Sequence, residues 1–424
     1  MADTGTPLAV PAAVHEALAT ICTEEGFKNP KYHVELGSEL GDGYTSVVYR
    51  VTIRDEDASG RVAAPLSVMC KTTQDGSAGG LFMGHIFASE GCMYETALPA
   101  FAEVARLAPP LPWPRCLRAA VGGPATSVPL LVLEDLRPEG FRMANRREPL
   151  DVQHLRLALT QLARFHGASM ALRQRRPADM KAIHDRLGNP FEMPQMRDAF
   201  KQFFAAATKA PDIIEDRFPE GSEIRAKLQK IFQHYIEDFF NAVTSHRDDE
   251  AGSGTVHGDC HINNMMFQYD KVSGAVTGCR LIDFQCSRAG CTAWDVATLL
   301  LPSSDKATRA AHWQELLRHY HGELQATLRA AGCPDPDAIY SWDQFTDRLR
   351  WASTFGLFMT PLLLQAMDSD AEAAQELRDS IAELSKSERV GEASVPLAFQ
   401  LKGTPQIKKR FGDLVQDLVD WGWL

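Results

Sequence analysis

Two polar motifs in the second half of the chain carry side chains that phosphoryl transfer requires. The first motif, TVHGDCHINNMMF, contains Asp259 and, five positions later, Asn264, and the second, LIDFQ, contains Asp283. A carboxylate such as Asp259 can accept the proton of a substrate hydroxyl or orient that hydroxyl, while Asn264 and Asp283 can hold magnesium against the phosphates of ATP. This spacing predicts a catalytic base and two metal ligands.

These residues also have simpler interpretations. HGDCHINN, in which His257 is expected to brace the backbone, can be a polar surface loop between two strands, and Asp283 can be a turn aspartate. Zinc is disfavoured because the spacing of the nearby ligand types fits no closed template. A cysteine nucleophile paired with the adjacent histidine is disfavoured because sequence neighbours rarely meet with the required geometry. The residues concerned are His257, Asp259, Cys260, His261 and Cys286.

The first half of the chain offers the other parts of such a site in the expected order. Gly41 and Gly43, in GDGYTSVVYRV, lie at a predicted turn where backbone NH groups could approach a phosphate. Lys71 ends an apolar strand and could reach the α and β phosphates, and Glu90 on the following helix could orient it. An ordinary hairpin turn and a solvated strand-end lysine are the alternatives. The order of turn, lysine, glutamate and HGD favours the functional interpretation.

A sheet-rich region followed by a helical one must position these residues. Alternation predicts two strands with a tight turn between them over His33–Ile53, and further strands at Leu66–Thr72 and Leu130–Leu133. Helical spacing predicts helices at Pro11–Glu25 and Phe87–Phe101. Strands followed by helices in this order predict an α+β fold with a small sheet-rich N-terminal lobe.

The chain beyond this region is predicted to be mostly helical. Residues 255–285 interrupt the helical pattern with two short strands around the polar motifs. Asp295 is expected to start a helix or brace a loop, and His166 to be a buried histidine with satisfied hydrogen bonds. The predicted helices are Asp151–Arg173, Ile224–Thr244, Trp313–Ala331, Trp342–Met359 and Asp370–Lys386.

We therefore expect one catalytic unit with two lobes and a cleft between them. Residues 1–133 would form the nucleotide-binding lobe with its leading helix, and 134–140, a polar segment with Pro and Gly, the hinge. Residues 141–424 would form the helical lobe with the catalytic loop and an acceptor pocket. Candidate apolar walls of that pocket are Trp313, Trp342, Trp351, Phe355 and Phe358.

Composition limits the classes of partner. The formal net charge of −11 argues against a nucleic-acid surface, which requires an excess of Lys and Arg. The nine cysteines form no CxxC pair, which fits a reducing, cytosolic setting. The N-terminal segment has no secretory pattern, and no run approaches the roughly 18 apolar residues of a membrane span. We therefore expect a cytoplasmic protein without a membrane span or a nucleic-acid partner.

The motifs together resemble the ecdysteroid kinase-like family, which is similar in turn to aminoglycoside phosphotransferases and choline kinases. The resemblance implies a protein-kinase-like fold, with ATP and magnesium used to phosphorylate a hydroxyl on a small molecule such as a steroid or another lipophilic metabolite. It extends over about Leu36–Leu301 and is carried by GDGYTSVVYRV, Lys71, FASEGCMYETALP, LVLEDL, ARFHGAS, VHGDCHINNMMF, LIDFQ and WDVATLL.

The resemblance also assigns roles to individual residues. It implies that Lys71 contacts the ATP phosphates and pairs with Glu90, and that Glu134 to Leu136 lie at the hinge near adenine. Gln285 stands where protein kinases have the glycine of their DFG motif, a departure that is normal for the resembled family and leaves magnesium binding intact.

The short interval after Asp283 limits the class of acceptor. Asp295, at the start of an apolar helix, follows twelve positions later (295 − 283), which leaves little room for the activation segment of a protein kinase. A small-molecule acceptor is therefore favoured. The alternatives are a kinase for a cationic acceptor such as choline or an aminoglycoside, attracted by acidic groups, and a catalytically silent nucleotide-binding scaffold.

Overall fold

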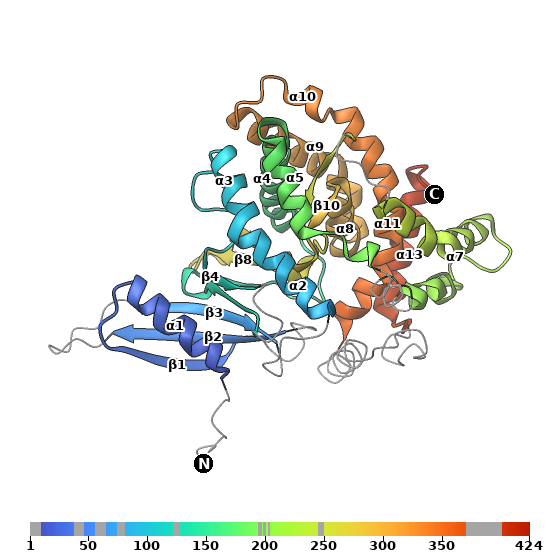
Figure 1. Cartoon of the computed structure of the whole chain (residues 1–424). Coiled ribbons are helices and arrows are strands. Elements are labelled where there is room, and N and C mark those ends of the chain that lie inside the picture. The colour runs from blue at the N-terminus through green and yellow to red at the C-terminus, as the bar shows by residue number, and fades with distance from the viewer. Residues whose placement is uncertain are drawn as a thin grey trace, which may run out of the picture.

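The computed structural model confirms the α+β fold class, with a small antiparallel sheet in the N-terminal part and a helical C-terminal part (Figure 1). The predicted turn with Gly41 and Gly43 and the predicted helix Asp370–Lys386 lie outside the described residues. The structure describes residues 10–37, 46–55, 65–73, 81–121, 128–193, 197, 201, 204–244, 250–369 and 401–424.

The N-terminal sheet has five strands in the order β1-β2-β3-β5-β4, and all neighbours are antiparallel. Helix α1 (Ala12–Glu24) covers the sheet, and its buried Val14 and Leu18 share one apolar cluster with Val51 and Val68 of the strands (Figure 1). The predicted strands are confirmed, and β4 was not predicted. The bounds of the five strands are β1 (Pro30–Leu36), β2 (Val47–Asp55), β3 (Leu66–Thr72), β4 (Cys116–Ala120) and β5 (Leu130–Glu134).

A helical segment between β3 and β4 carries Glu90. The predicted helix Phe87–Phe101 is confirmed and extends beyond both predicted ends. Glu90 is buried within it, as are Phe87 and Tyr94. The segment consists of α2 (Leu81–Cys92), a π-helical turn (Met93–Ala97) and α3 (Leu98–Val104).

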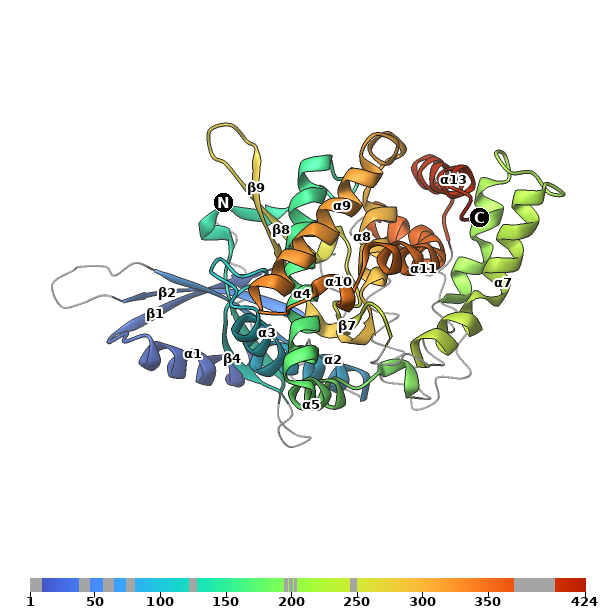
Figure 2. The same cartoon turned by 90° about the horizontal axis from the view of Figure 1, so that it is seen from above.

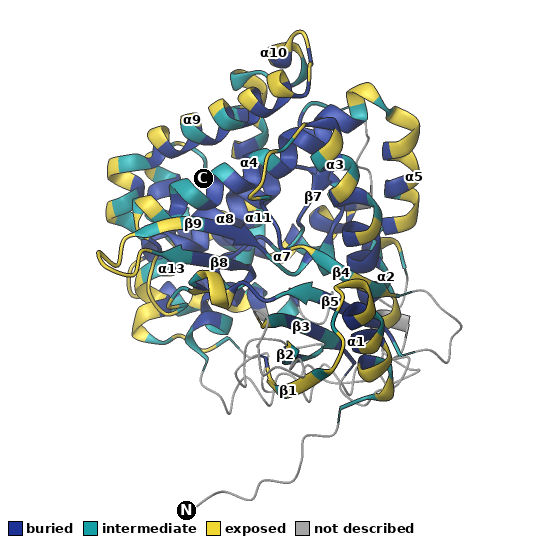
Figure 3. Ribbon diagram, turned by 90° about the vertical axis from the view of Figure 1, so that its left-hand side faces the viewer, coloured by how far each residue is buried: buried dark blue, intermediate teal, exposed yellow. Residues whose placement is uncertain are grey.

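The C-terminal part is built around α4 (Val152–Arg175), which begins where the Asp151 side chain accepts the amides of Gln153 and His154. Helices α9 and α8 pack near it, and α11 packs on α8 (Figure 2). Buried positions face inward from all of these helices (Figure 3). The other helices are α5 (Pro177–Leu187), α7 (Glu223–Thr244), α8 (Ala293–Ser303), α9 (Lys306–Ala330), α10 (Pro336–Ile339), α11 (Trp342–Asp368) and α13 (Pro405–Asp420).

Several helix ends differ from the sequence predictions. Helices α4 and α7 match, but α9 begins at Lys306, where Asp305 caps it, well before the predicted start at Trp313. Helix α11 continues past Met359 because Pro361 lies within it without ending it. Helices α5 and α13 were not predicted. Pro177 lies at the first position of α5, where proline needs no amide partner.

Short strands frame the two polar motifs. Three of them, instead of the predicted two, fall within or overlap residues 255–285. Strand β7 pairs with β10, and β8 lies between β6 and β9. The motifs therefore occupy two connections, 257–264 and 282–287. The strands are β6 (Phe141–Met143), β7 (Ser253–Val256), β8 (Met265–Tyr269), β9 (Val276–Leu281) and β10 (Arg288–Cys291).

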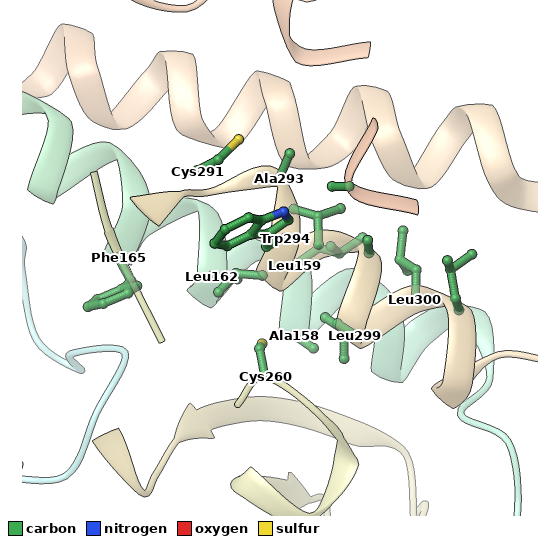
Figure 4. Packing of buried hydrophobic residues seen from close by; sticks show 14 of the residues in the cluster. Ala158, Leu159, Leu162, Phe165, Cys260, Cys291, Ala293, Trp294, Leu299 and Leu300 are labelled. Atoms are coloured by element: carbon green, nitrogen blue, oxygen red, sulfur yellow. The ribbon is translucent and has the colours of Figure 1, made fainter. Parts of the chain in front are cut away.

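The apolar core extends to the base of the first connection. Cys260 lies in the same buried cluster as Leu162 and Phe165 of α4 and Leu299 of α8 (Figure 4). All nine cysteines are unpaired. Among the described residues, no helix has the length and apolar character that crossing a membrane requires.

Candidate active site

Lys71 is the centre of a charge cluster. It lies on β3 between β2 and β5, and 12% of its side chain is exposed. Its Nζ donates to Glu90 Oε2 and to Asp283 Oδ1, each at 2.7 Å. The alternative of a solvated strand-end lysine is therefore wrong. The contact joins Lys71 to Asp283 across 212 positions of sequence.

One ammonium in this cluster faces two carboxylates. Burial lowers the pKa of Lys71, but the charges of Asp283 and Glu90 outweigh burial and raise that pKa above its usual value. Burial raises the pKa of Glu90 to about 7, because Lys71 compensates only in part and the charge of Asp283 adds to the effect. The cluster can therefore accommodate a further cation.

Helix α2 is attached to the segment after Asp283, the 3₁₀ turn η6 (Phe284–Cys286). Ser89 Oγ donates to Ser287 O at 3.2 Å, and the Phe284 amide donates to the Glu90 carboxylate. Tyr94, which follows α2, packs edge-on against the Phe284 ring with 5.7 Å between the centroids. These contacts hold Glu90 on Lys71.

Asp259 is held by residues of its own connection. Asn264 Nδ2 donates to Asp259 O at 2.8 Å and to its Oδ2 at 2.9 Å, while His261 Nε2 lies 3.1 Å from Oδ1. His261 Nδ1 accepts the amide of Asn263, which leaves Nε2 as the donor to Asp259. Burial raises the pKa of Asp259, but His261 and Asn264 outweigh burial and lower it to about 2. Asp259 is therefore ionised at neutral pH.

The backbone before Asp259 is fixed from α8 and α4. Asp295 Oδ2 accepts the His257 amide at 2.6 Å, and Oδ1 accepts the Gly258 amide at 3.0 Å. His166 Nε2 lies 3.0 Å from Asp295 Oδ2, and its Nδ1 lies 2.8 Å from Tyr320 Oη. Burial raises the pKa of Asp295, but these partners outweigh burial and lower it. The predicted bracing role of Asp295 and the satisfied, buried state of His166 are confirmed.

The importance of Gly258 was not predicted from the sequence. Its φ is +83°, and a Cβ placed there would lie 2.1 Å from Cys286 O and 2.6 Å from Arg288 Nη1. No other residue type fits both the conformation and the space. The glycine of the HGD motif was the only signal in the sequence. The need for glycine is explained by the second connection, which packs against this position in the folded protein.

The two connections are also joined by hydrogen bonds. The Ile282 amide donates to Asn264 O at 3.0 Å, and His257 Nε2 lies 3.0 Å from Ile282 O, so His257 braces the backbone as expected. Asp283 then adopts a left-handed conformation with φ 67° and ψ 65°, which is strained for a residue with a side chain. That conformation brings its carboxylate to Lys71.

Asn264 and Asp283 fit a magnesium ion by the chemistry of their free oxygens. Asn264 donates through Nδ2 in both of its hydrogen bonds to Asp259, and 28% of the Asp283 side chain is exposed. Amide and carboxylate oxygens are hard ligands that suit Mg²⁺, which usually takes one or two carboxylates together with substrate phosphates. No group of three His, Cys, Asp or Glu side chains within the described ranges could hold a metal by itself.

A cysteine nucleophile at this site has no support from the geometry. The Cys260 side chain is buried, and burial raises the pKa of its thiol well above the usual value. His261, its sequence neighbour, is engaged with Asp259. A thiolate is therefore disfavoured here.

The predicted hinge residues are placed at the end of β5. Glu134 Oε1 accepts the Arg115 amide at 2.8 Å, and Leu136 is buried. Between them Asp135 accepts Arg50 Nε at 2.6 Å. A place for Glu134 and Leu136 beside adenine stays a prediction.

Comparison with known proteins assigns this arrangement to a family. Residues 40–333, more than half of the chain, match the model of the ecdysteroid kinase-like family. No curated protein matches the chain significantly.

Among solved structures, the chain is similar to a putative aminoglycoside phosphotransferase from Ralstonia eutropha, with 12% identity over 95% of this chain and 98% of that one and a TM-score of 0.41. It is also similar to the ethanolamine kinase of Plasmodium vivax, with 12% identity over 87% of each chain and a TM-score of 0.39. A thermostable aminoglycoside phosphotransferase, solved with ADP and hygromycin B, has 15% identity over 86% of this chain and 98% of that one and a TM-score of 0.33.

Proposed function

The chain belongs to the ecdysteroid kinase-like family, and we propose that it is an ATP- and magnesium-dependent kinase that phosphorylates a hydroxyl of a steroid or another lipophilic small molecule. The observation that carries the proposal is the contact of Lys71 with both Glu90 and Asp283. It joins the end of β3, helix α2 and the second polar connection at one point, close to the connection that holds Asp259. Phosphoryl transfer requires such convergence because its catalysis is mostly positioning and charge stabilisation.

Asp259 orients the acceptor hydroxyl. Because its pKa is about 2, it stays ionised and can accept a hydrogen bond from that hydroxyl. A carboxylate of such low basicity is a weak general base, so the proton transfers to it late, as the new bond to phosphorus forms. His261 and Asn264 fix the direction of the carboxylate.

Lys71 binds the phosphates, and Glu90 keeps it in position. Asn264 and Asp283 would hold the magnesium ion, which neutralises phosphate charge when bound. Gly41 and Gly43 would cover the phosphates, while Glu134 and Leu136 would lie beside adenine.

The division into a nucleotide lobe (1–133), a hinge (134–140) and an acceptor-binding helical lobe (141–424) is part of the same proposal. The nine unpaired cysteines support a reducing, cytoplasmic location. A small-molecule hydroxyl is the proposed partner, and nucleic acid is not.

The direct test is transfer of labelled γ-phosphate from Mg·ATP to a library of hydroxysteroids and other alcohols by the full chain. Asp259→Asn is expected to lower turnover about 100-fold while nucleotide affinity stays within about twofold. Asp270→Asn is the matched control, because Asp270 lies in the exposed turn after β8 and accepts only groups of that turn. Nucleotide binding without any phosphorylated product, with Asp259→Asn leaving background hydrolysis unchanged, would contradict the proposal and indicate a silent scaffold.

A further inference from the structure

Strand β1 (Pro30–Leu36) forms one edge of the N-terminal sheet, and among the described residues it pairs with β2 alone (Figure 1). Four large hydrophobic residues are exposed in the described part of the chain, and two of them, Tyr32 and Leu36, lie on this strand. They are 38% and 55% exposed. The open edge of a strand, with apolar side chains beside it, is a template on which another strand can pair.

The exposed side chains of β1 continue the apolar face of the sheet. Tyr32 lies opposite the buried Ile53, and Val34 lies opposite the buried Val51. Residues that lie opposite one another on neighbouring strands have their side chains on the same face. Helix α1, which covers this face, contacts β5 and β4 at the other side of the sheet more closely than β1. The apolar face therefore extends to the β1 edge, where Tyr32 and Leu36 are exposed.

The outward-pointing backbone groups of β1 belong to the same residues. The amide of Gly37, directly after β1, donates to Val48 O of β2 at 2.7 Å. Bonded and non-bonded positions alternate along antiparallel strands, so the odd-numbered residues of β1 bond to β2. The amides and carbonyls of the even-numbered residues Tyr32, Val34 and Leu36 therefore point away from the sheet.

The sequence of β1, PKYHVEL, is complementary to a second copy of itself in one antiparallel register. With His33 opposite His33 of the copy, Tyr32 lies opposite Val34, and both have outward-pointing backbone groups. Lys31 then lies opposite Glu35 on the other face. Sliding one copy by two residues in either direction keeps the backbone bonding but removes both contacts between Lys31 and Glu35.

Glu35 keeps negative charge available for such a contact. Arg50 Nη1 donates to Glu35 Oε1 at 2.9 Å, but Arg50 Nε also donates to Asp135 Oδ2 at 2.6 Å. One cation therefore faces two carboxylates, and one negative charge is left over. Because 45% of the Glu35 side chain is exposed, a lysine from outside the chain can reach it.

We propose that β1 pairs with β1 of a second copy of this chain about a twofold axis at His33, so that the two N-terminal sheets become one. Tyr32 and Val34 exchange backbone hydrogen bonds with Val34 and Tyr32 of the copy. Pro30 and Lys31 are residue types that protect strand edges, and they disfavour unrelated strands, whereas the copy offers Glu35 to the lysine. The inference is independent of the proposed kinase function.

The first test is the oligomeric state of the full chain by sedimentation. One strand pair makes an interface smaller than the roughly 1,600 Å² of a standard one, so we expect a weak dimer with a Kd of about 10 μM. Val34→Pro removes an amide that points outward and keeps every bond to β2, so it should raise the Kd at least about tenfold. A wild-type chain that stays monomeric at about 100 μM would contradict the proposal.

The second test exchanges charges. Lys31→Glu and Glu35→Lys each place like charges opposite one another across the axis, so each variant should be monomeric by itself at about 100 μM. An equal mixture of the two should form a heterodimer, because every glutamate at these positions then faces a lysine. Lys271→Glu is the matched control, since it makes the same charge change in the exposed turn after β8 and should leave the Kd unchanged.

Failure of the mixture to associate, or a dimer whose Kd neither charge variant changes, would overturn the proposal. Thermal melting shows whether each variant is folded. If Val34→Pro does not fold, the two charge variants decide, since both positions are exposed.

The third test reports the register. His33→Cys places two thiols opposite one another at a non-bonded pair, where the distance between Cα atoms suits a disulfide, so mild oxidation should give a covalent dimer. Lys31→Cys is the control, because its two thiols would lie four residues apart along the strands, roughly 13 Å, and should not cross-link. Cross-linking of both variants, or of neither, would show that the proposed register is wrong.

Discussion

The connection that carries Asp259 and the strand that carries Lys71 meet at one site, but they are held in different ways. The amides of Thr255, His257 and Gly258 are all bound by side chains from α4 and α8, namely Ser169 and Asp295. The Lys71 side chain, in contrast, is held by carboxylates that are themselves candidate site residues.

The position of Asp259 is therefore fixed by the fold, whereas the position of the Lys71 side chain is set by the charges around it. The Asp259 connection is preorganised by buried groups that no ligand touches, so its geometry does not depend on a bound nucleotide. The Lys71 cluster depends on the balance of its own charges, which phosphates and magnesium change when they bind. Substitutions beneath Asp259 should therefore affect stability and activity together, whereas substitutions around Lys71 should change the response to pH and to nucleotide.

The largest effect is expected from Gly258→Ala. The added methyl group would lie 2.1 Å from Cys286 O at a φ of +83°, so either the loop or η6 must move. We expect a loss of roughly 4 kcal/mol in unfolding free energy, together with loss of phosphoryl transfer. Gly274→Ala is the control, because Gly274 has a φ of +71° with nothing within 4 Å. It should cost only about 1 kcal/mol, and equal losses in urea denaturation would show that close packing at Gly258 is unimportant.

Asp295→Asn should have the next largest effect. The two carboxylate oxygens accept amides from His257 and Gly258, so an asparagine must point its NH₂ group at one of these donors. We expect about 3 kcal/mol of destabilisation and a fall in kcat with a smaller change in the KM for ATP.

Asp305→Asn is the control for that substitution. Asp305 caps α9 by accepting the amide and the side chain of Thr308, and an asparagine oxygen can accept both, so the change should stay within about 0.5 kcal/mol. An equally small effect of Asp295→Asn would contradict the inference that α8 preorganises the Asp259 connection.

The sequence predicted the elements better than their contacts. Local alternation and helical spacing were sufficient for β3, β5, α4 and α7, because each buries a regular face. The end of α11 was missed because Pro361 is tolerated within that helix. The start of α9 was missed because Asp305 provides a cap before the apolar pattern becomes regular.

Within the site, residue types were predictable and partners were not. The sequence suggested that Lys71 and Glu90 pair, but it could not show that Asp283 reaches the same ammonium from 212 positions away. It assigned His261 only to disfavoured alternatives, although His261 holds Asp259. Gly258 is likewise explained only by Cys286, which approaches from another segment. Contacts across the chain are set by the fold and leave no local pattern.

A smaller change in stability, which depends on pH, is expected from a substitution in the Lys71 cluster of the ligand-free protein. The folded pKa of Glu90 is raised from 4.5 to about 7, so its contribution to stability is present below pH 4.5 and is lost as pH rises through 7. Glutamine mimics the protonated form. Glu90→Gln should therefore gain stability relative to wild type between pH 5 and pH 8, measured by urea denaturation at each pH.

The stability contributed by Asp259 and Asp295 should depend on pH in the opposite direction. The folded pKa of Asp259 is lowered to about 2 and that of Asp295 is also lowered, so their contributions are present above their usual pKa and are lost in acid. A pH-independent difference between Glu90→Gln and wild type would mean that Lys71 keeps Glu90 ionised throughout and that the two regions respond to pH alike.

The smallest effect is expected at Glu134. Its carboxylate accepts the Arg115 amide near the surface, so Glu134→Gln keeps an acceptor and should cost less than about 1 kcal/mol. If the Glu134 side chain does not contact the nucleotide, nucleotide affinity measured by titration calorimetry should stay within about twofold. Asp135→Asn, next to it, replaces a buried carboxylate that accepts Arg50 and Ser67 and should weaken both stability and nucleotide binding more. A large loss of affinity in Glu134→Gln alone would place its side chain, instead of the backbone, in the nucleotide site.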